Sequence, residues 1–215
     1  MDQKQNGAQG LAVLIHGLWM NGMEMTLLRW RLHAAGYRTA RFRYRSMGQT
    51  IGENASRFIE FIETQRPRYI VAHSLGGLVT LRAFEARPDL PVERVVFLGA
   101  PVRGSQVARA LLSLRWGPTM LGRAGAGVLA AHHEPVWRFA PPLGVLAGEQ
   151  SAGLGRLAAR FDGVNDGTVA VSETVIEGAS DTLTLNVGHM SMLASRAVAD
   201  QVIHFLRDGA FLTRS

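Results

Sequence analysis

Short apolar runs alternate with longer helical patterns along most of the chain, and this alternation constrains the fold more than any other feature. Runs with the length and composition of strands lie at residues 11–17, 37–45, 68–72, 92–101, 143–149 and 181–189. Patterns with helical spacing lie between them, at residues 22–36, 52–65 and 75–87, and a last one covers about 190–207. Strands separated by helices pair in parallel through right-handed crossovers. The sequence therefore predicts an α/β fold with a doubly wound, mostly parallel sheet of about six strands and helices on both faces.

Length and composition favour one folded domain. The chain has 215 residues, of which 47% are hydrophobic and 19% charged, so it is long enough to bury a substantial core. No internal repeat and no linker rich in proline and serine divides it. We expect a flexible polar tail at residues 1–10 and a single domain at 11–215. Within that domain, residues 103–142 are rich in glycine, alanine and leucine, and only residues 108–116 suggest a helix.

Composition also excludes several classes of protein. The chain has no cysteine, which rules out disulfides and a thiol nucleophile and fits a reducing compartment, so we expect a cytoplasmic protein. No apolar run approaches the roughly 20 residues of a transmembrane segment. The net charge of +6 rests on arginine, yet the most basic stretch, residues 38–46, alternates arginine with Phe42 and Tyr44 as an edge strand does. We therefore expect no nucleic-acid partner, and the oligomeric state does not follow from the sequence.

Ser74 directly follows a buried strand pattern and precedes a helical one. In an open parallel sheet, ligands bind beyond the carboxyl ends of the strands, and a sharp strand-to-helix turn there would expose the Ser74 hydroxyl. Ala72 and Gly76 supply the small residues that such a turn needs, in the pattern of a nucleophile elbow with alanine in the first glycine position. The Leu75 amide, at the helix N-terminus, would point toward an anion formed beside the serine. We predict Ser74 to be a nucleophile, with a plain turn as the alternative.

A serine nucleophile needs a base, and His189 is the best placed of the seven histidines. It follows the last predicted strand and so lies at the same edge of the sheet as Ser74. His16 also ends a strand but precedes Gly17, where we expect it to hold the loop in shape. His73 should point into the fold from the tight turn. His189 is therefore the predicted base, with His16 and His73 as weaker candidates.

Asp166 is the predicted partner of that base. It lies on a turn in "NDGTV", after the fifth predicted strand, which gives the chain order Ser74, Asp166, His189 that such a sheet requires. Asp162, four residues earlier and also before a glycine, is the main alternative. Asp181 begins the last strand, at the end far from His189, which counts against it.

The adjacent pair His132 and His133, beside Glu134, raises the possibility of a metal site. Neighbouring histidines project differently from either a helix or a strand, and no third and fourth ligand is evident. We therefore expect no metal and no other cofactor.

The loop after the first strand, in "VLIHGLWMNG", would supply a second donor for an oxyanion. Its strand lies next to the strand of Ser74 in the predicted sheet, so the Leu18 amide can act together with the Leu75 amide. Trp19 and Met20 in this loop, with Met190 beside the base, indicate an apolar substrate pocket. Ordinary core packing is the alternative for these three side chains.

The motifs "LIHGLW", "VAHSLGG", "FLGAPVRGS", "NDGTV" and "NVGHMSML", in this order, resemble the α/β-hydrolase superfamily and, within it, the bacterial lipases and esterases. The resemblance covers residues 11–206. It implies a compact α/β-hydrolase fold lacking the first two strands, a triad of Ser74, Asp166 and His189, oxyanion donors at Leu18 and Leu75, and no cofactor.

We therefore expect a serine hydrolase that cleaves a carboxylic ester of a small molecule or a lipid, through an acyl-enzyme on Ser74. Residues 103–142 leave room for a short cap or lid over an acyl chain, although an ordinary helix covering the sheet is the alternative. The apolar candidates for such a lid are Leu111, Leu112, Leu114 and Trp116. An acyltransferase, a thioesterase or amidase with the same triad, and a non-catalytic binding protein of the same fold are the rival interpretations.

Overall fold

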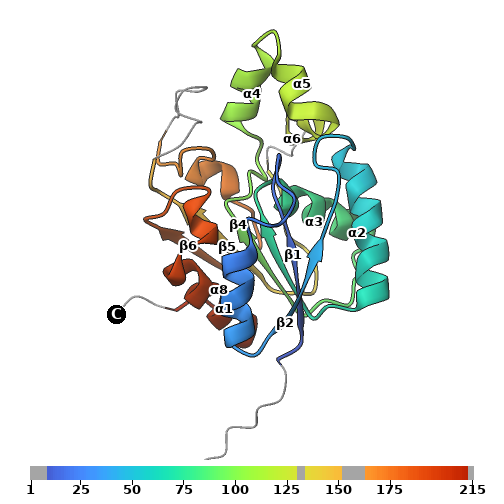
Figure 1. Cartoon of the computed structure of the whole chain (residues 1–215), viewed down its shortest axis with the longest axis vertical. Coiled ribbons are helices and arrows are strands. Elements are labelled where there is room, and N and C mark those ends of the chain that lie inside the picture. Colours follow the sequence, from blue (N-terminus) through green and yellow to red (C-terminus); the bar gives the residue numbers. More distant parts are fainter. Residues whose placement is uncertain (1–8, 130–133, 152–162, 213–215) are drawn as a thin grey trace, which may run out of the picture.

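A computed structural model describes residues 9–129, 134–151 and 163–212 of the chain. The first eight residues of the predicted tail lie outside this part. The strands are β1 (Leu11–Ile15), β2 (Arg38–Phe42), β3 (Tyr69–His73), β4 (Arg94–Leu98), β5 (Leu143–Gly148) and β6 (Asp181–Leu185). They form one sheet of six strands in the order β2-β1-β3-β4-β5-β6, and every neighbouring pair is parallel (Figure 1). The predicted fold class is confirmed.

Helices cover both faces of the sheet. The longer ones are α1 (Thr26–Ala34), α2 (Ile51–Gln65), α3 (Leu75–Ala86) and α8 (Arg196–Asp208). The core of one face packs against α2 and α3, and the core of the other face packs against α1 and α8. Along β1, Val13 and Ile15 belong to the first core, whereas Ala12 and Leu14 belong to the second. Burial on both faces explains why the central strands have nearly continuous apolar sequences.

Strand β2 lies at one edge of the sheet, as its alternating sequence predicts. Phe42 and Tyr44 are buried and stack on each other, whereas Arg43 and Arg45 are exposed. These arginines therefore form the exposed face of an edge segment whose other face is buried.

Two helix starts differ from the prediction, and in both cases a side-chain cap sets the boundary. Helix α2 begins at Ile51, one residue before the predicted start at 52, because the Thr50 hydroxyl caps it by accepting from the Glu53 amide. The predicted helix from residue 190 is a short 3-10 turn, Ser191–Leu193, followed by α8, which begins after the capping hydroxyl of Ser195.

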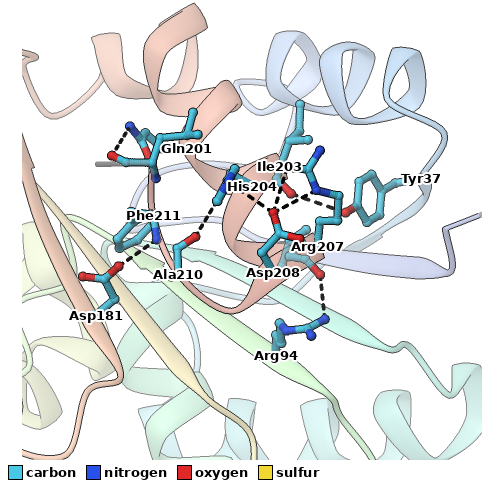
Figure 2. Close-up of polar contacts among 12 residues, drawn as sticks. Tyr37, Arg94, Asp181, Gln201, Ile203, His204, Arg207, Asp208, Ala210 and Phe211 are labelled. Carbon is cyan, nitrogen blue, oxygen red and sulfur yellow. Dashed lines mark hydrogen bonds and ion pairs between the residues drawn. The ribbon is translucent and has the colours of Figure 1, made fainter. Parts of the chain in front are cut away.

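A group of polar contacts fixes the end of α8 to the amino-terminal edge of the sheet (Figure 2). Arg94, at the start of β4, donates to the Leu206 carbonyl over 2.9 Å. Asp181, at the start of β6, accepts from the Phe211 amide over 2.7 Å. These residues lie at the opposite end of the strands from Ser74, so this network supports the scaffold and stays apart from the site.

Residues 106–129, called the cap segment from here on, rise beyond the carboxyl ends of the strands (Figure 1). They hold α4 (Gln106–Leu112), α5 (Gly117–Leu121), a 3-10 turn (Gly122–Ala124) and α6 (Gly125–Leu129). The predicted helix at 108–116 therefore ends at Leu112. Across the described ranges, no helix is long and apolar enough to cross a membrane.

Candidate active site

Ser74 occupies a strained turn between β3 and α3. Its backbone angles are φ 55° and ψ −124°, a left-handed φ that costs a residue other than glycine roughly 1–3 kcal/mol. Backbone hydrogen bonds hold the turn, since the Ser74 amide donates to the Leu98 carbonyl over 2.9 Å. A Cβ atom added at Gly76 would lie 2.7 Å from the Ile15 carbonyl oxygen, so only glycine lets α3 approach β1 this closely. Ser74 is thereby presented at the carboxyl end of the sheet.

Asp166 and His189 form a buried pair. The His189 Nδ1 lies 2.7 Å from Asp166 Oδ2, and His189 and Asp166 expose 7% and 1% of their surface. The other carboxylate oxygen accepts from the amides of Thr168 and Val169, over 2.9 and 2.7 Å. With Nδ1–H donated to the carboxylate, the His189 Nε2 is the nitrogen left to act as a base.

Glycines at the ends of two strands make room for this pair. Gly99, which follows β4, has a φ of +54°, and a Cβ added there would lie 3.1 Å from both Asp166 Oδ2 and His189 Nδ1. A Cβ added at Gly148, in β5, would lie 2.7 Å from the Asp166 Cβ. The acid and the base are therefore packed directly against the sheet, which fixes their relative position.

His16 and His73, the weaker candidates for the base, are engaged in contacts of their own. The Nδ1 of His16 donates to the Gly17 carbonyl over 2.9 Å, and its ring stacks on Tyr44 at 4.4 Å. His73 is fully buried, and its Nε2 donates to the His189 carbonyl over 3.1 Å. His16 contacts the loop that follows it, and His73 points into the fold, as the sequence predicts for each.

Asp181 cannot serve as the acid partner of His189. The Phe211 amide holds it at the far end of β6 (Figure 2), so its carboxylate does not reach the base. Asp162, the main rival of Asp166 for this role, lies outside the described residues, and so do His132 and His133.

A cavity of about 460 Å³ opens above Ser74, and its lining is mainly apolar. Ser74 and His189 both contribute to it, and so do the five predicted oxyanion and pocket residues, Leu18, Trp19, Met20, Leu75 and Met190. The cap segment contributes Leu111, Leu114, Met120, Leu121 and Val128. Of the four residues expected in a lid, Leu111 and Leu114 line the cavity. Leu112 does not, and neither does Trp116, which is 68% exposed. The lid itself stays a prediction.

No hydrogen bond joins Ser74 to His189 in this structure, although both residues are described and line the same cavity. Catalytic hydrogen bonds are often long before substrate binds and tighten in the complex. Ser74 and His189 therefore line one cavity, but the hydrogen bond through which the serine proton would pass to His189 is not formed in this structure.

The two predicted oxyanion donors come from adjacent segments. A Cβ added at Gly17 would lie 3.0 Å from the Ser74 Cβ, so the loop after β1 touches the elbow. In the described part of the chain, neither the Leu18 amide nor the Leu75 amide has a hydrogen-bond partner. Two free amides beside a serine can hold an oxyanion.

Glu173 is a buried carboxylate near the site that no sequence motif indicates. It is 5% exposed, and it accepts from the Ala170 amide over 2.9 Å and from the Gln106 amide over 2.5 Å. Burial raises the pKa of its carboxyl. It joins the loop of Asp166 to the start of α4, a contact between residues 67 apart that no local pattern reveals.

We expect the two buried histidines to make stability sensitive to mild acid. Burial holds the pKa of His73 well below 6.5 and also lowers the pKa of His16. The second nitrogen of each ring has no hydrogen-bond partner among the described residues, so a second proton would create an unpaired buried charge. The unfolded chain protonates the same rings near pH 6.5, so the unfolded state binds more protons below that pH.

The free energy of unfolding should therefore be level above pH 7 and fall below pH 6.5. His73 contributes a slope of about 1.4 kcal/mol per pH unit, and His16 adds up to the same amount until its own lowered pKa is reached. Urea denaturation at pH 7.5, 6.5 and 5.5 measures this. A variant of an exposed histidine, His33→Gln, should keep the slope. Equal stability at pH 7.5 and 5.5 would contradict the expectation.

A parallel sheet with a serine at a strained strand-to-helix turn and a buried Asp–His pair at the same edge defines a hydrolase-type α/β protein. A sequence model of the alpha/beta hydrolase family matches residues 12–181. The chain therefore belongs to the α/β-hydrolase family. No curated protein was found to match it.

Solved structures share this fold at low sequence identity. Lipase BlEst2 of Bacillus licheniformis is 22% identical, with a TM-score of 0.62, over 86% of this chain and 87% of that one. An esterase of Exiguobacterium antarcticum is 15% identical, with a TM-score of 0.61, over 92% of both chains. A bromoperoxidase of Bacillus anthracis is 16% identical, with a TM-score of 0.57, also over 92% of both chains. These similarities establish the fold. The reaction has to be argued from the residues of the site.

Proposed function

We propose that the protein is a serine hydrolase that cleaves a carboxylic ester through an acyl-enzyme on Ser74. The observation that carries this proposal is the buried hydrogen bond between His189 Nδ1 and Asp166 Oδ2, at the edge of the same cavity as Ser74. The carboxylate holds the imidazole in the tautomer whose Nε2 can accept the serine proton.

In the first half-reaction, His189 would take the hydroxyl proton as Ser74 Oγ bonds to the ester carbonyl carbon. The carbonyl oxygen becomes an oxyanion, and the amides of Leu18 and Leu75 would hold it. Collapse of this intermediate breaks the bond to the alcohol oxygen, which receives the proton from His189. In the second half-reaction, His189 activates a water that attacks the acyl carbon and releases the acid and free Ser74.

The lining of the cavity supports an apolar acyl group as the part of the substrate next to Ser74. Met20, Met190 and the cap-segment leucines are apolar and adaptable in shape. Two proteins of similar fold are named a lipase and an esterase, which supports an ester as the substrate.

A fluorophosphonate tests the proposal, because it reacts with a serine that is activated by a base and an oxyanion hole. We expect intact-protein mass spectrometry to show one adduct on the wild type and none on Ser74→Ala, and peptide mapping to place it on Ser74. Hydrolysis of short-chain aryl esters should then be lost in the same variant. A folded wild type that forms no adduct and cleaves no ester would contradict the proposal and favour a non-catalytic binding role.

A further inference from the structure

Trp19 has an unusual conformation for a bulky aromatic residue. It directly follows Leu18, its φ is +59°, and 55% of its surface is exposed. A left-handed φ is rare for a large side chain and persists only where the surroundings impose it. Some contact must therefore hold this residue in place.

The contact is a hydrogen bond to the cap segment. The Trp19 indole Nε1–H donates to the Met120 carbonyl in α5 over 2.6 Å, and it joins residues 101 positions apart in the chain. Both residues line the cavity. The bond therefore joins the loop after β1 to the cap segment at the wall of the cavity.

The acceptor end of this bond is itself fixed. Just after α5, the Arg123 amide donates to the Met47 carbonyl over 2.8 Å, and the Arg123 guanidinium pairs with Glu53 on α2 at 3.0 Å. A Cβ added at Gly122 would collide with the Met47 carbonyl oxygen, so the turn is packed against the loop before α2. The Met120 carbonyl, which accepts the hydrogen bond from the indole, is thus held by the body of the domain.

We infer that Trp19 is a positioning residue for the oxyanion hole. Its bond to the cap segment holds the loop that carries the Leu18 amide in the strained conformation that turns this amide toward the cavity. The cap segment thereby acts on the reaction through the loop after β1 as well as by covering the substrate. This inference rests on the proposed function.

The variant Trp19→Phe tests it, because phenylalanine keeps an aromatic ring in the cavity wall and removes the N–H donor together with the five-membered ring of the indole. Trp30→Phe is the matched control, since Trp30 is 65% exposed on α1 and does not line the cavity. Loss of one oxyanion donor lowers kcat by roughly 100- to 1,000-fold, and a misplaced donor should cost less. With a soluble aryl ester, we expect Trp19→Phe to lower kcat about 10-fold with KM within about twofold, and the control to match the wild type.

Hydrogen–deuterium exchange supplies a readout that needs no turnover. Peptides covering residues 11–22 and 106–129 should exchange faster in Trp19→Phe than in the wild type, and equally fast in Trp30→Phe and the wild type. If only KM changed, Trp19 would contact the substrate without positioning the oxyanion hole, and the inference would be overturned. An unchanged kcat with an unchanged KM would overturn it as well. A wild type that forms no Ser74 adduct and turns over no ester would instead overturn the proposed function, and this inference with it.

Discussion

Replacing Asp166 with asparagine should lower kcat about 10,000-fold and leave the fold intact. The asparagine side chain keeps an oxygen that can accept from the Thr168 and Val169 amides, so the turn that carries it is retained. In place of Oδ2 it presents an NH₂ group to His189 Nδ1, which must then accept a hydrogen bond. The imidazole proton moves to Nε2, and the ring can no longer receive the proton of Ser74.

Steady-state kinetics and urea denaturation of the same preparation separate the two effects. The free energy of unfolding should change by no more than about 1 kcal/mol, as expected for exchanging one hydrogen-bonded group for another. Asp162→Asn is the matched comparison, because Asp162 is the rival acid and also precedes a glycine. If Asp166→Asn kept the wild-type kcat and Asp162→Asn lost most of it, Asp162 and not Asp166 would be the acid that orients His189.

The fold could be predicted because each strand and helix is encoded over a few neighbouring residues. The alternation of apolar runs and helical patterns is local, and so is the period of two along β2. Helix boundaries were less predictable, because they depend on which hydroxyl reaches the free amides. Thr50 and Ser195 do so here, and their hydrogen bonds start α2 and α8 at residues that hydrophobic spacing alone does not select.

The second half of the cap segment could not be predicted from its own sequence. Residues 117–129 consist largely of glycine, alanine and other small or apolar residues without a clear period, and the two helices there have five residues each. Helices this short are not stable on their propensity alone. Close contacts from Gly122 to Met47 and from Gly127 to Ile51 fix them against the loop before α2 and the first residue of α2.

Ser74, Asp166 and His189 could be predicted to lie together because each follows a strand of one parallel sheet, and such strands end at a common edge. The long-range contacts around the site could not. Glu173 meets the start of α4, and Trp19 meets Met120, through contacts between segments far apart in the sequence. In the sequence, Gly99 is only one residue of a motif that resembles a lipase segment. Its importance depends on Asp166 and His189, which pack against it in the folded protein.

The position of Gly99 against Asp166 and His189 predicts a second large effect on activity. Gly99→Ala should lower kcat/KM at least about 10-fold, because the added methyl pushes its neighbours aside by a few tenths of an ångström, and a displacement of about 1 Å at a reacting group costs about 100-fold. The added methyl would lie 3.1 Å from both Asp166 Oδ2 and His189 Nδ1, two atoms that are themselves 2.7 Å apart. The third neighbour, Met192 Cε at 3.2 Å, is the end of a flexible side chain and can move aside, whereas the hydrogen-bonded pair is buried. The pair must separate or tilt, and either movement displaces Nε2 relative to Ser74.

The φ of +54° at Gly99 adds a cost in stability, so the variant needs a control with the same backbone strain and no contact with the pair. Gly209→Ala supplies it, since Gly209 ends α8 with a φ of +80° and its nearest neighbour, Arg94, lies at 3.5 Å. Urea denaturation should show a loss of about 1–2 kcal/mol for Gly209→Ala and more for Gly99→Ala. Only Gly99→Ala should lose activity and fluorophosphonate reactivity. Equal activity in the two variants would mean that the Asp166–His189 pair tolerates displacement, and the close packing against β4 would then serve stability alone.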